Sequence, residues 1–239
     1  MKFYFTNPII QFLVIIFSLI VGSCSQIKAQ NINSDQIPAI RYLALGDSYT
    51  IGTGIDSLHN YPNQISDSLQ TRGIAVDTTS IIATNGWTTS DLKQGIMTQS
   101  PDSTYTLVSL LIGVNNQYQG LNLDIYQKEF KQLLENAIAL AGGIRSNVLV
   151  ISIPNYGVTP FGQSRNPVVI RQELQVYNDI AKKISVGKNI PFVNITPASE
   201  LAKNDPSLLA SDDLHPSAKM YAMWVEEMLP TIIKILSNE

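Results

Sequence analysis

The sequence predicts an α/β fold in which a five-stranded parallel sheet is covered by helices on both faces. Short apolar runs of strand length alternate along the chain with longer segments of helical periodicity. The apolar runs are nearly continuous, which is typical of strands that are buried on both faces. The length of 239 residues suits one such domain once a leader segment is set aside.

Five short runs are predicted to be the strands of this sheet. The first run is broken abruptly by Gly46, and the third is apolar throughout except for Ser109. Such runs have the length of buried strands. The predicted strands are Tyr42–Leu45, Val76–Ala83, Leu107–Ile112, Val148–Ile153 and Phe192–Ile195.

Helix signals separate these runs. Thr88 and Asp91 have the spacing of a capping box, so a helix is expected to begin there. The clearest helix has one apolar stripe and is followed by a Gly-Gly pair. The predicted helices are Tyr61–Thr71, one from Thr88, Asp124–Ala141, one that reaches about Val186, and one that starts at Pro216 and is kinked or interrupted by Pro230.

The N-terminal segment is expected to be a leader and not part of the fold. Lys2 precedes an apolar run, 12–21, that has the length of a signal peptide and is too short to span a membrane. Small residues before Cys24 resemble a bacterial lipoprotein signal, which implies cleavage of 1–23 and lipid attachment to Cys24. An ordinary signal cut near Ala29 and a short membrane anchor are the alternatives.

The predicted organisation is therefore a signal peptide at 1–23, a tether at 24–38 and one folded domain at 39–239. The tether is rich in Ser, Asn and Gln. We expect an exported protein of the periplasm, outer membrane or cell envelope, with the lipid on Cys24 as its only membrane anchor. The chain has one cysteine, so an intramolecular disulfide is excluded.

Composition argues against several classes of protein. The net charge of -3 and the pI near 5.4 give no support to nucleic-acid binding. One cysteine and two histidines do not make a usual zinc site. Asp205, Asp212 and Asp213 lack the regular ligand spacing of a calcium loop. We expect neither a metal nor a cofactor, and we expect a monomer.

The candidate nucleophile is Ser48, which lies just past the end of the first predicted strand. The carboxyl ends of parallel strands are where open α/β sheets present their chemistry. The stretch does not fit the dinucleotide fingerprint, the phosphate loop with its lysine, or the hydrolase elbow G-x-S-x-G. The alternative is that Asp47 and Ser48 only cap a helix.

The stretch Gly46-Asp47-Ser48-Tyr49 resembles the opening block of the SGNH, or GDSL-type, hydrolases. That family is named for four blocks that carry Ser, Gly, Asn and His, and Gly86, Asn115 and His215 match the other three in order. The resemblance implies a flavodoxin-like three-layer α/β/α fold. It also implies that Ser48, Gly86 and Asn115 form an oxyanion hole and that the Asp-x-x-His block supplies the catalytic base.

Strand order along the chain supports the oxyanion assignment independently. Gly86 follows the second predicted strand and Asn115 the third, so both are expected at the same sheet edge as Ser48. Two backbone amides and one side-chain amide at that edge supply donors for a developing oxyanion. Taken singly, Asn85-Gly86 is also a common turn pair and Asn115-Asn116 a common loop pair.

Two histidines compete for the role of general base. His59 and His215 both end an Asp-x-Leu-His sequence, so the local text does not separate them. We favour His215, because it follows the last strand and precedes Pro216, which restricts the backbone. Asp212 is expected to orient His215, with Asp213 as the competitor. The alternative for this acidic pair is a solvated turn or a helix cap.

The third block departs from the family pattern. The family usually has G-x-N-D, whereas this chain has Gly113-Val114-Asn115-Asn116. The amide donor is present, but an amide replaces the acid after it. This difference places the support of the loop in question.

These residues predict a serine esterase that acts on a small-molecule, glycan or lipid ester. An acyltransferase or lysophospholipase that uses the same site and a catalytically inactive envelope binding module are the alternatives. A long loop, Pro154–Pro167, is predicted to bring Tyr156 and Phe161 to the wall of the acyl or alcohol pocket. The alternative is that this loop is only structural.

Overall fold

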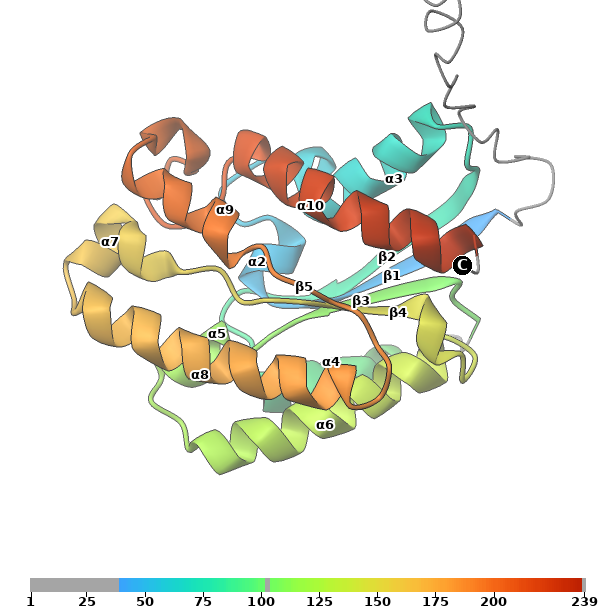
Figure 1. The fold of residues 1–239 in the computed structure, drawn as a ribbon, viewed down its shortest axis with the longest axis horizontal. Helices are drawn as coiled ribbons and strands as arrows, with labels where there is room; N and C mark the ends of the chain where they lie inside the picture. Colours follow the sequence, from blue (N-terminus) through green and yellow to red (C-terminus); the bar gives the residue numbers. More distant parts are fainter. Residues whose placement is uncertain (1–38, 102–103, 238–239) are drawn as a thin grey trace, which may run out of the picture. The chain divides into compact units, whose positions relative to one another are not determined.

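The first strand, β1 (Ile40–Gly46), lies inside a five-stranded sheet with the order β2-β1-β3-β4-β5, and every pairing in it is parallel (Figure 1). The computed structural model describes residues 39–101 and 104–237. The predicted signal peptide, tether and lipidation site at Cys24 lie outside these residues. The predicted parallel sheet is confirmed, and its order is that of flavodoxin-like folds. The strands are β1, β2 (Val76–Ala83), β3 (Leu107–Leu111), β4 (Val148–Ile151) and β5 (Phe192–Val193).

Helices cover both faces of the sheet, which confirms the three-layer α/β/α prediction (Figure 1). One layer contains α3 and α10, which pack against each other, and the other contains α4, α6 and α8. The bounds are α2 (Ser48–Ile51), α3 (Tyr61–Thr71), α4 (Thr89–Gln99), α5 (Val114–Tyr118), α6 (Leu123–Leu140), α7 (Pro160–Gln163), α8 (Pro167–Val186), α9 (Thr196–Glu200) and α10 (Ala218–Ser237). Short 3-10 turns are η2 (Ser57–His59), η3 (Arg145–Asn147), η4 (Tyr156–Val158), η5 (Leu201–Lys203) and η6 (Pro206–Leu208).

Local sequence explains where the best-predicted helices begin. Thr88 and Asp91 form the expected capping box at the start of α4, with the Thr88 N–H donating to the Asp91 carboxylate at 2.9 Å. The apolar stripe of α6 is buried, from Phe130 to Ile138. Each large apolar side chain buried in this way stabilises the fold by roughly 1.5 to 3 kcal/mol. Among the described helices, none combines the length and apolar character needed to cross a membrane.

Three details differ from the sequence-based expectation. The segment after β4 is not a structureless loop, because it contains η4 and α7; the Thr159 hydroxyl accepts from the Gly162 N–H and caps α7. The last helix begins at Ala218 and not at Pro216. Pro230 does not interrupt α10, since buried side chains on both sides of it, including Met228 and Ile232, hold the helix against the sheet.

Strand register places the predicted site residues at one edge. Gly46, the last residue of β1, pairs with Ala83 of β2 and with Leu111 of β3. The three chain segments that leave these strands therefore start level with one another. β3, β4 and β5 end two residues or fewer before the predicted limits, at Leu111, Ile151 and Val193, so the connecting segments begin slightly earlier than expected.

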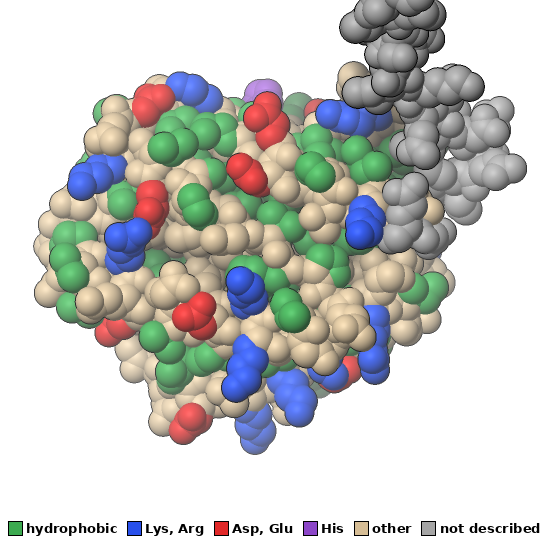
Figure 2. Space-filling view, viewed as in Figure 1, with side chains coloured by type: hydrophobic (Ala, Val, Ile, Leu, Met, Phe, Trp, Pro, Cys, Tyr) green, Lys and Arg blue, Asp and Glu red, His purple; other side chains and the backbone are tan. Residues whose placement is uncertain are grey.

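Charged side chains are dispersed over the face of the molecule that Figure 2 shows. Acidic and basic groups are interspersed among neutral ones there, in keeping with the small net charge of -3.

Candidate active site

The chain turns sharply from β1 into α2, and this turn presents Ser48. A Cβ added to Gly46 would lie 2.5 Å from the Leu111 carbonyl oxygen, so only glycine fits. Asp47 caps α2 by accepting the Tyr49 N–H at 3.0 Å. The helix-cap alternative and the nucleophile hypothesis are therefore compatible, because Asp47 caps while Ser48 lines a pocket.

The last helix holds this turn from behind. The Tyr221 hydroxyl of α10 donates to the Tyr49 carbonyl at 2.9 Å, across a separation of 172 residues in the sequence. Asp47 is fully buried, and its Oδ2 atom has no hydrogen-bond partner among the described residues. Burial raises the pKa of the Asp47 carboxyl to about 7. The carboxyl group next to Ser48 is thus buried and, within the described part of the chain, hydrogen-bonded through only one of its two oxygens.

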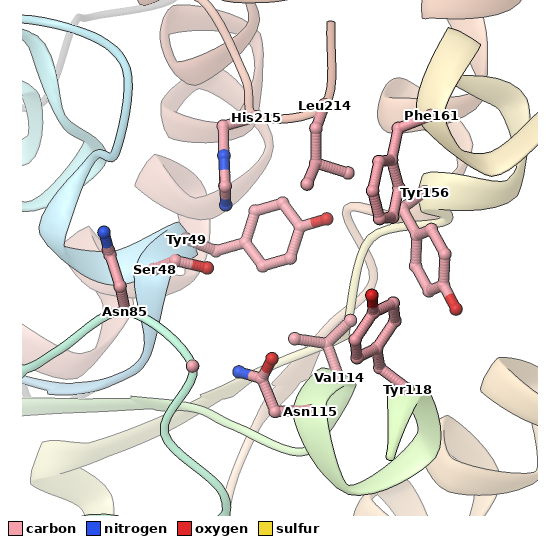
Figure 3. Close-up of a pocket in the computed structure, with 11 residues that line it drawn as sticks. Ser48, Tyr49, Asn85, Val114, Asn115, Tyr118, Tyr156, Phe161, Leu214 and His215 are labelled. Atoms are coloured by element: carbon pink, nitrogen blue, oxygen red, sulfur yellow. The ribbon is translucent and has the colours of Figure 1, made fainter. Parts of the chain in front are cut away.

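Ser48 and His215 line one cavity of about 250 Å³ (Figure 3). The cavity combines polar groups near Ser48 with an apolar and aromatic wall on the other side. In Figure 3 the His215 ring lies above Ser48, and Asn115 lies below it. The lining residues are Ser48, Tyr49, Asn85, Gly86, Val114, Asn115, Tyr118, Tyr156, Phe161, Leu214 and His215.

His215 is held by Asp212 and by an aromatic ring. The Nδ1 atom of His215 lies 2.6 Å from Asp212 Oδ2, and its backbone N–H donates to Asp212 Oδ1 at 2.9 Å. The ring of Tyr49 packs against the imidazole, with centroids 5.4 Å apart. The Nδ1 contact leaves Nε2 as the nitrogen that is available to the pocket.

The carboxylate of Asp212 is stabilised in its charged form. Partial burial alone would raise the pKa of Asp212, but hydrogen bonds from the His215 ring and from the backbone N–H groups of Leu214 and His215 lower it below its ordinary value. An ionised partner stabilises a protonated imidazole. This is the electrostatic arrangement that a general base needs.

The environment of His59 differs from that of His215, although both residues end the same Asp-x-Leu-His sequence. It ends η2 in an exposed position, and its backbone N–H donates to the Asp56 carbonyl in a 3-10 turn. The His215 segment differs because Asp213 adopts a left-handed conformation, with φ of 57°. This conformation prevents a 3-10 turn, and the Asp212 side chain receives the His215 N–H instead.

Asp213 does not contact the His215 ring through any hydrogen bond found among the described residues. Its carbonyl accepts from the Phe161 N–H at 3.4 Å, and its own N–H donates to the Ala210 carbonyl. Its side chain is exposed. The geometry thus favours Asp212 over Asp213 as the partner of His215.

The three predicted oxyanion donors lie around the same cavity. Gly86 has a φ of 78°, which favours glycine, and a Cβ there would meet nothing within 4 Å, so the backbone conformation and not crowding explains this residue. Ser48 is the first residue of α2, where the backbone N–H has no partner within the helix. Asn115 donates one amide hydrogen to the Trp87 carbonyl at 2.9 Å, and the second hydrogen remains for the cavity.

The amide that replaces the family acid supports its loop. Asn116 is 1% exposed, accepts from the Thr89 N–H at 3.0 Å and donates to the Thr89 hydroxyl at 2.8 Å. These bonds tie the turn of Asn115 to the start of α4. Asn116 therefore supports the loop that carries Asn115, even though it replaces the acid of the usual G-x-N-D pattern.

Tyr156 and Phe161 both line the cavity and come from the segment after β4; that they bound an acyl or alcohol pocket stays a prediction. Tyr156 is 4% exposed, and its hydroxyl donates to Gln117 at 2.9 Å. Sequence reasoning missed Tyr118, which is 43% exposed and packs with both aromatic rings at centroid distances of 6.3 and 6.0 Å. The guanidinium of Arg165 lies over the Tyr118 ring and donates to its hydroxyl at 2.7 Å.

Other lining residues were missed for a common reason. Tyr49, Val114 and Leu214 each stand next to a predicted site residue in the sequence, but nothing in their local pattern marks a pocket. Asn85 was considered only as part of a turn. Its Oδ1 accepts from the Thr53 hydroxyl, which holds it beside Gly86. Adjacency to Ser48, Gly86, Asn115 and His215 was the only available signal.

Comparison with solved structures finds similar folds. TesA has a TM-score of 0.62 and 15% identity, with 81% of this chain and 98% of that chain covered. Axe2, an acetylxylan esterase from Geobacillus stearothermophilus, has a TM-score of 0.61 and 23% identity, with 82% and 95% covered. The psychrotrophic esterase EstA from Pseudoalteromonas sp. has a TM-score of 0.59 and 19% identity, with 82% and 98% covered. At these identities the likeness establishes the shared fold.

Two comparisons use the sequence alone. None of the curated proteins compared with the chain matches it. The sequence model of the GDSL-like lipase/acylhydrolase family matches residues 44–223. This match begins within β1 and ends within α10, so it includes all four blocks of the site. The chain therefore belongs to the GDSL-like lipase/acylhydrolase family and is a serine hydrolase that acts on ester bonds.

Proposed function

We propose that the enzyme hydrolyses carboxylic esters through an acyl-enzyme formed on Ser48. The observation that carries this proposal is that the Asp212–His215 pair and Ser48 meet at one cavity. In the first step, Ser48 Oγ attacks the ester carbonyl carbon while His215 Nε2 accepts the hydroxyl proton. Asp212 keeps the Nδ1–H tautomer and stabilises the imidazolium that results.

The developing negative charge lies on the former carbonyl oxygen. The N–H groups of Ser48 and Gly86 and the side-chain amide of Asn115 donate to it, and the charge appears only as the tetrahedral intermediate forms. Collapse of this intermediate breaks the ester C–O bond. The leaving alcohol receives the proton from His215. A water oxygen then attacks the acyl carbon while His215 takes the water proton. The bond from this carbon to Ser48 Oγ breaks, His215 returns the proton to Oγ, and the carboxylic acid leaves.

The aromatic side of the cavity supports a preference for a short acyl chain. Phe161, Tyr118 and Val114 form an apolar wall across the cavity from Ser48, and the cavity of about 250 Å³ is small for a ligand site. We infer that this wall receives the acyl group and that the alcohol part faces the Asn85 side. The acetylxylan esterase among the structural neighbours is compatible with a short acyl group.

Two experiments test this function. A fluorophosphonate probe should label the folded protein, and peptide mapping should place the adduct on Ser48. Hydrolysis of p-nitrophenyl esters should be fastest for short acyl chains. An adduct on another residue, or labelling only after denaturation, would refute the nucleophile assignment.

The same assays separate the alternatives. Acyl transfer to an added alcohol in preference to water would indicate an acyltransferase, and a strong preference for single-chain phospholipids a lysophospholipase. An inactive binding module would neither react with the probe nor hydrolyse any ester. The presence of Ser48, Asp212 and His215 in one site argues against that module.

Export and lipid attachment belong to the proposal as well. The leader at 1–23 and the small residues before Cys24 support an anchored protein of the cell envelope. Metabolic labelling with a fatty acid, compared between the native chain and Cys24→Ser, tests the anchor. Release of an unlabelled native protein into the soluble fraction would contradict it.

A further inference from the structure

Two loops of the oxyanion hole are hydrogen-bonded directly to each other. Asn115 donates to the Trp87 carbonyl, and Asn116 makes two bonds with Thr89, at 3.0 Å to its N–H and 2.8 Å to its hydroxyl. Trp87 and Thr89 follow Gly86 in the chain. We call Trp87, Thr89, Asn115 and Asn116 the oxyanion clip, because these bonds join the Gly86 turn to the Asn115 turn.

The directions of the hydrogen bonds in the clip follow from the number of hydrogens available. The Thr89 backbone N–H can only donate, so the Asn116 atom opposite it is the amide oxygen, and the amide nitrogen faces the Thr89 hydroxyl. The hydroxyl therefore accepts from Asn116. Its single hydrogen is left to be donated elsewhere.

Glu129 of α6 accepts that hydrogen. Its Oε2 lies 2.6 Å from the Thr89 hydroxyl, and its Oε1 accepts from the Ser90 hydroxyl at 2.6 Å. Lys93 lies 3.6 Å from the same carboxylate. Partial burial alone would raise the pKa of Glu129, but the bonds from Ser90 and Thr89 and the charge of Lys93 lower it. Glu129 is thus a charged acceptor, and such hydrogen bonds are the stronger kind.

We propose that Glu129 is a positioning residue for the oxyanion hole and replaces the acid that the third block of this chain lacks. It acts through the Thr89 hydroxyl and Asn116 on the turn that carries Asn115. Glu129 is not one of the residues that line the cavity, so it acts at a distance. This inference rests on the proposed function, because it assumes that Asn115 and Gly86 stabilise the oxyanion.

The proposal makes Asn116 and Glu129 interdependent. An acid at position 116 would accept from both the N–H and the hydroxyl of Thr89. The one hydroxyl hydrogen would then be shared by two carboxylates, which also repel each other. If Glu129 becomes an amide at the same time, its nitrogen can donate to the Thr89 hydroxyl, which then donates to the new acid. The whole chain of hydrogen bonds reverses and is satisfied again.

The test is a set of single and double variants assayed with a short-chain p-nitrophenyl ester, well below their melting temperatures. Glu129→Ala should lower kcat by about tenfold to a hundredfold with little change in KM, since small misplacement of catalytic groups costs rate. Glu129→Gln, which keeps an acceptor for Thr89, should retain most of the turnover. Asn116→Asp should lower kcat, and Asn116→Asp combined with Glu129→Gln should recover it.

Glu135→Ala is the matched control, because Glu135 lies on the same helix and pairs with Lys188 away from the cavity. It should leave kcat unchanged. An unchanged kcat in Glu129→Ala, or an Asn116→Asp defect that Glu129→Gln does not relieve, would overturn the proposal. The proposal would also be overturned if the kcat of Glu129→Ala rose on refolding or cooling in proportion to the folded fraction, because the loss would then come from unfolding.

Asn115→Ala measured alongside separates this inference from the proposed function. If Asn115→Ala loses turnover and Glu129→Ala does not, the positioning role is refuted and the oxyanion assignment stands. If neither loses turnover, the oxyanion assignment itself is wrong, and the positioning role is refuted with it.

Discussion

The carboxylate of Asp212 holds His215 at two points, with one oxygen 2.6 Å from the imidazole Nδ1 and the other 2.9 Å from the backbone nitrogen of the same residue. The side chain and the backbone of His215 are therefore positioned by one group. No comparable pairing between Asp56 and the ring of His59 is found in the described part of the chain, and His59 is exposed. The structure therefore distinguishes two segments that share the Asp-x-Leu-His sequence.

The first prediction concerns the two histidines. His215→Ala should remove nearly all turnover, because His215 shares the cavity with Ser48. His59→Ala should keep most of it and serves as the control. Steady-state hydrolysis of a short-chain ester measures both. A dead His59→Ala enzyme beside an active His215→Ala enzyme would show that the site is assigned to the wrong histidine.

The second prediction concerns the tautomer of the base. Asp212→Asn should reduce kcat by up to about 10⁴, since an amide in this place favours the wrong imidazole tautomer. Asp213→Asn should be much milder, because the Asp213 side chain is exposed and its contacts to Phe161 and Ala210 use the backbone. Equal losses in the two variants would argue against Asp212 as the orienting residue.

The third prediction concerns the oxyanion donor. Asn115→Ala should lower kcat by on the order of 10² to 10³, as expected for one lost donor. The variant also loses the bond to the Trp87 carbonyl, so its melting temperature is the control. Kinetics at a temperature where the variant is fully folded gives the comparison. A normal kcat there would reduce Asn115 to a loop residue.

The fourth prediction concerns the aromatic wall. Phe161→Ala should shift the acyl preference towards longer chains, because Phe161 borders the cavity and is only partly buried. Tyr156→Ala is a poorer test, since Tyr156 is 4% exposed and truncating a buried aromatic costs about 3 to 5 kcal/mol. Hydrolysis rates for esters of different acyl length, measured together with the melting temperature of each variant, test this prediction. A changed melting temperature with an unchanged preference would assign the segment a structural role.

The fifth prediction concerns Asp47 and pH. Its pKa is raised to about 7 by burial, above the value of 3.8 of an ordinary Asp. The folded state then binds more protons than the unfolded state between these two values, so this group's contribution is present at low pH and is lost as the pH rises towards 7. A tenfold difference in proton affinity between the two states corresponds to about 1.4 kcal/mol of stability.

Asp47→Asn removes this titration and keeps an oxygen for the Tyr49 N–H. The free energy of unfolding of the native protein, measured relative to that of the variant, should fall between about pH 4 and pH 7. Denaturant unfolding at several pH values measures it. A difference that is constant over this range would mean that Asp47 does not titrate there.

Much of the fold could be predicted, because it depends on patterns that are local in the sequence. The apolar strands and the stripe of α6 marked the layers, and Thr88 with Asp91 marked the start of α4. Predictions failed where tertiary contacts override a local rule. Pro230 is tolerated inside α10 because burial on both sides of it holds the helix, and the local rule for proline takes no account of that burial.

The candidate site could likewise be predicted only in part. Ser48, Gly86, Asn115 and His215 stand in recognisable blocks, so the sequence indicated them. Tyr118 and Glu129 could not be found, because each acts through a contact with a distant segment: Tyr118 through Phe161, and Glu129 through Thr89. A single sequence contains no record of such pairs.

The hydrogen bond from Tyr221 to the Tyr49 carbonyl has a consequence for biosynthesis. The turn that presents the nucleophile is made early by the ribosome, but the hydroxyl that holds it from behind is among the last parts of the chain to emerge. His215 also arrives late. On the proposed mechanism, a nascent or C-terminally truncated chain that lacks His215 has its serine but not its base, so ester turnover is expected only when translation is complete and α10 has packed in place.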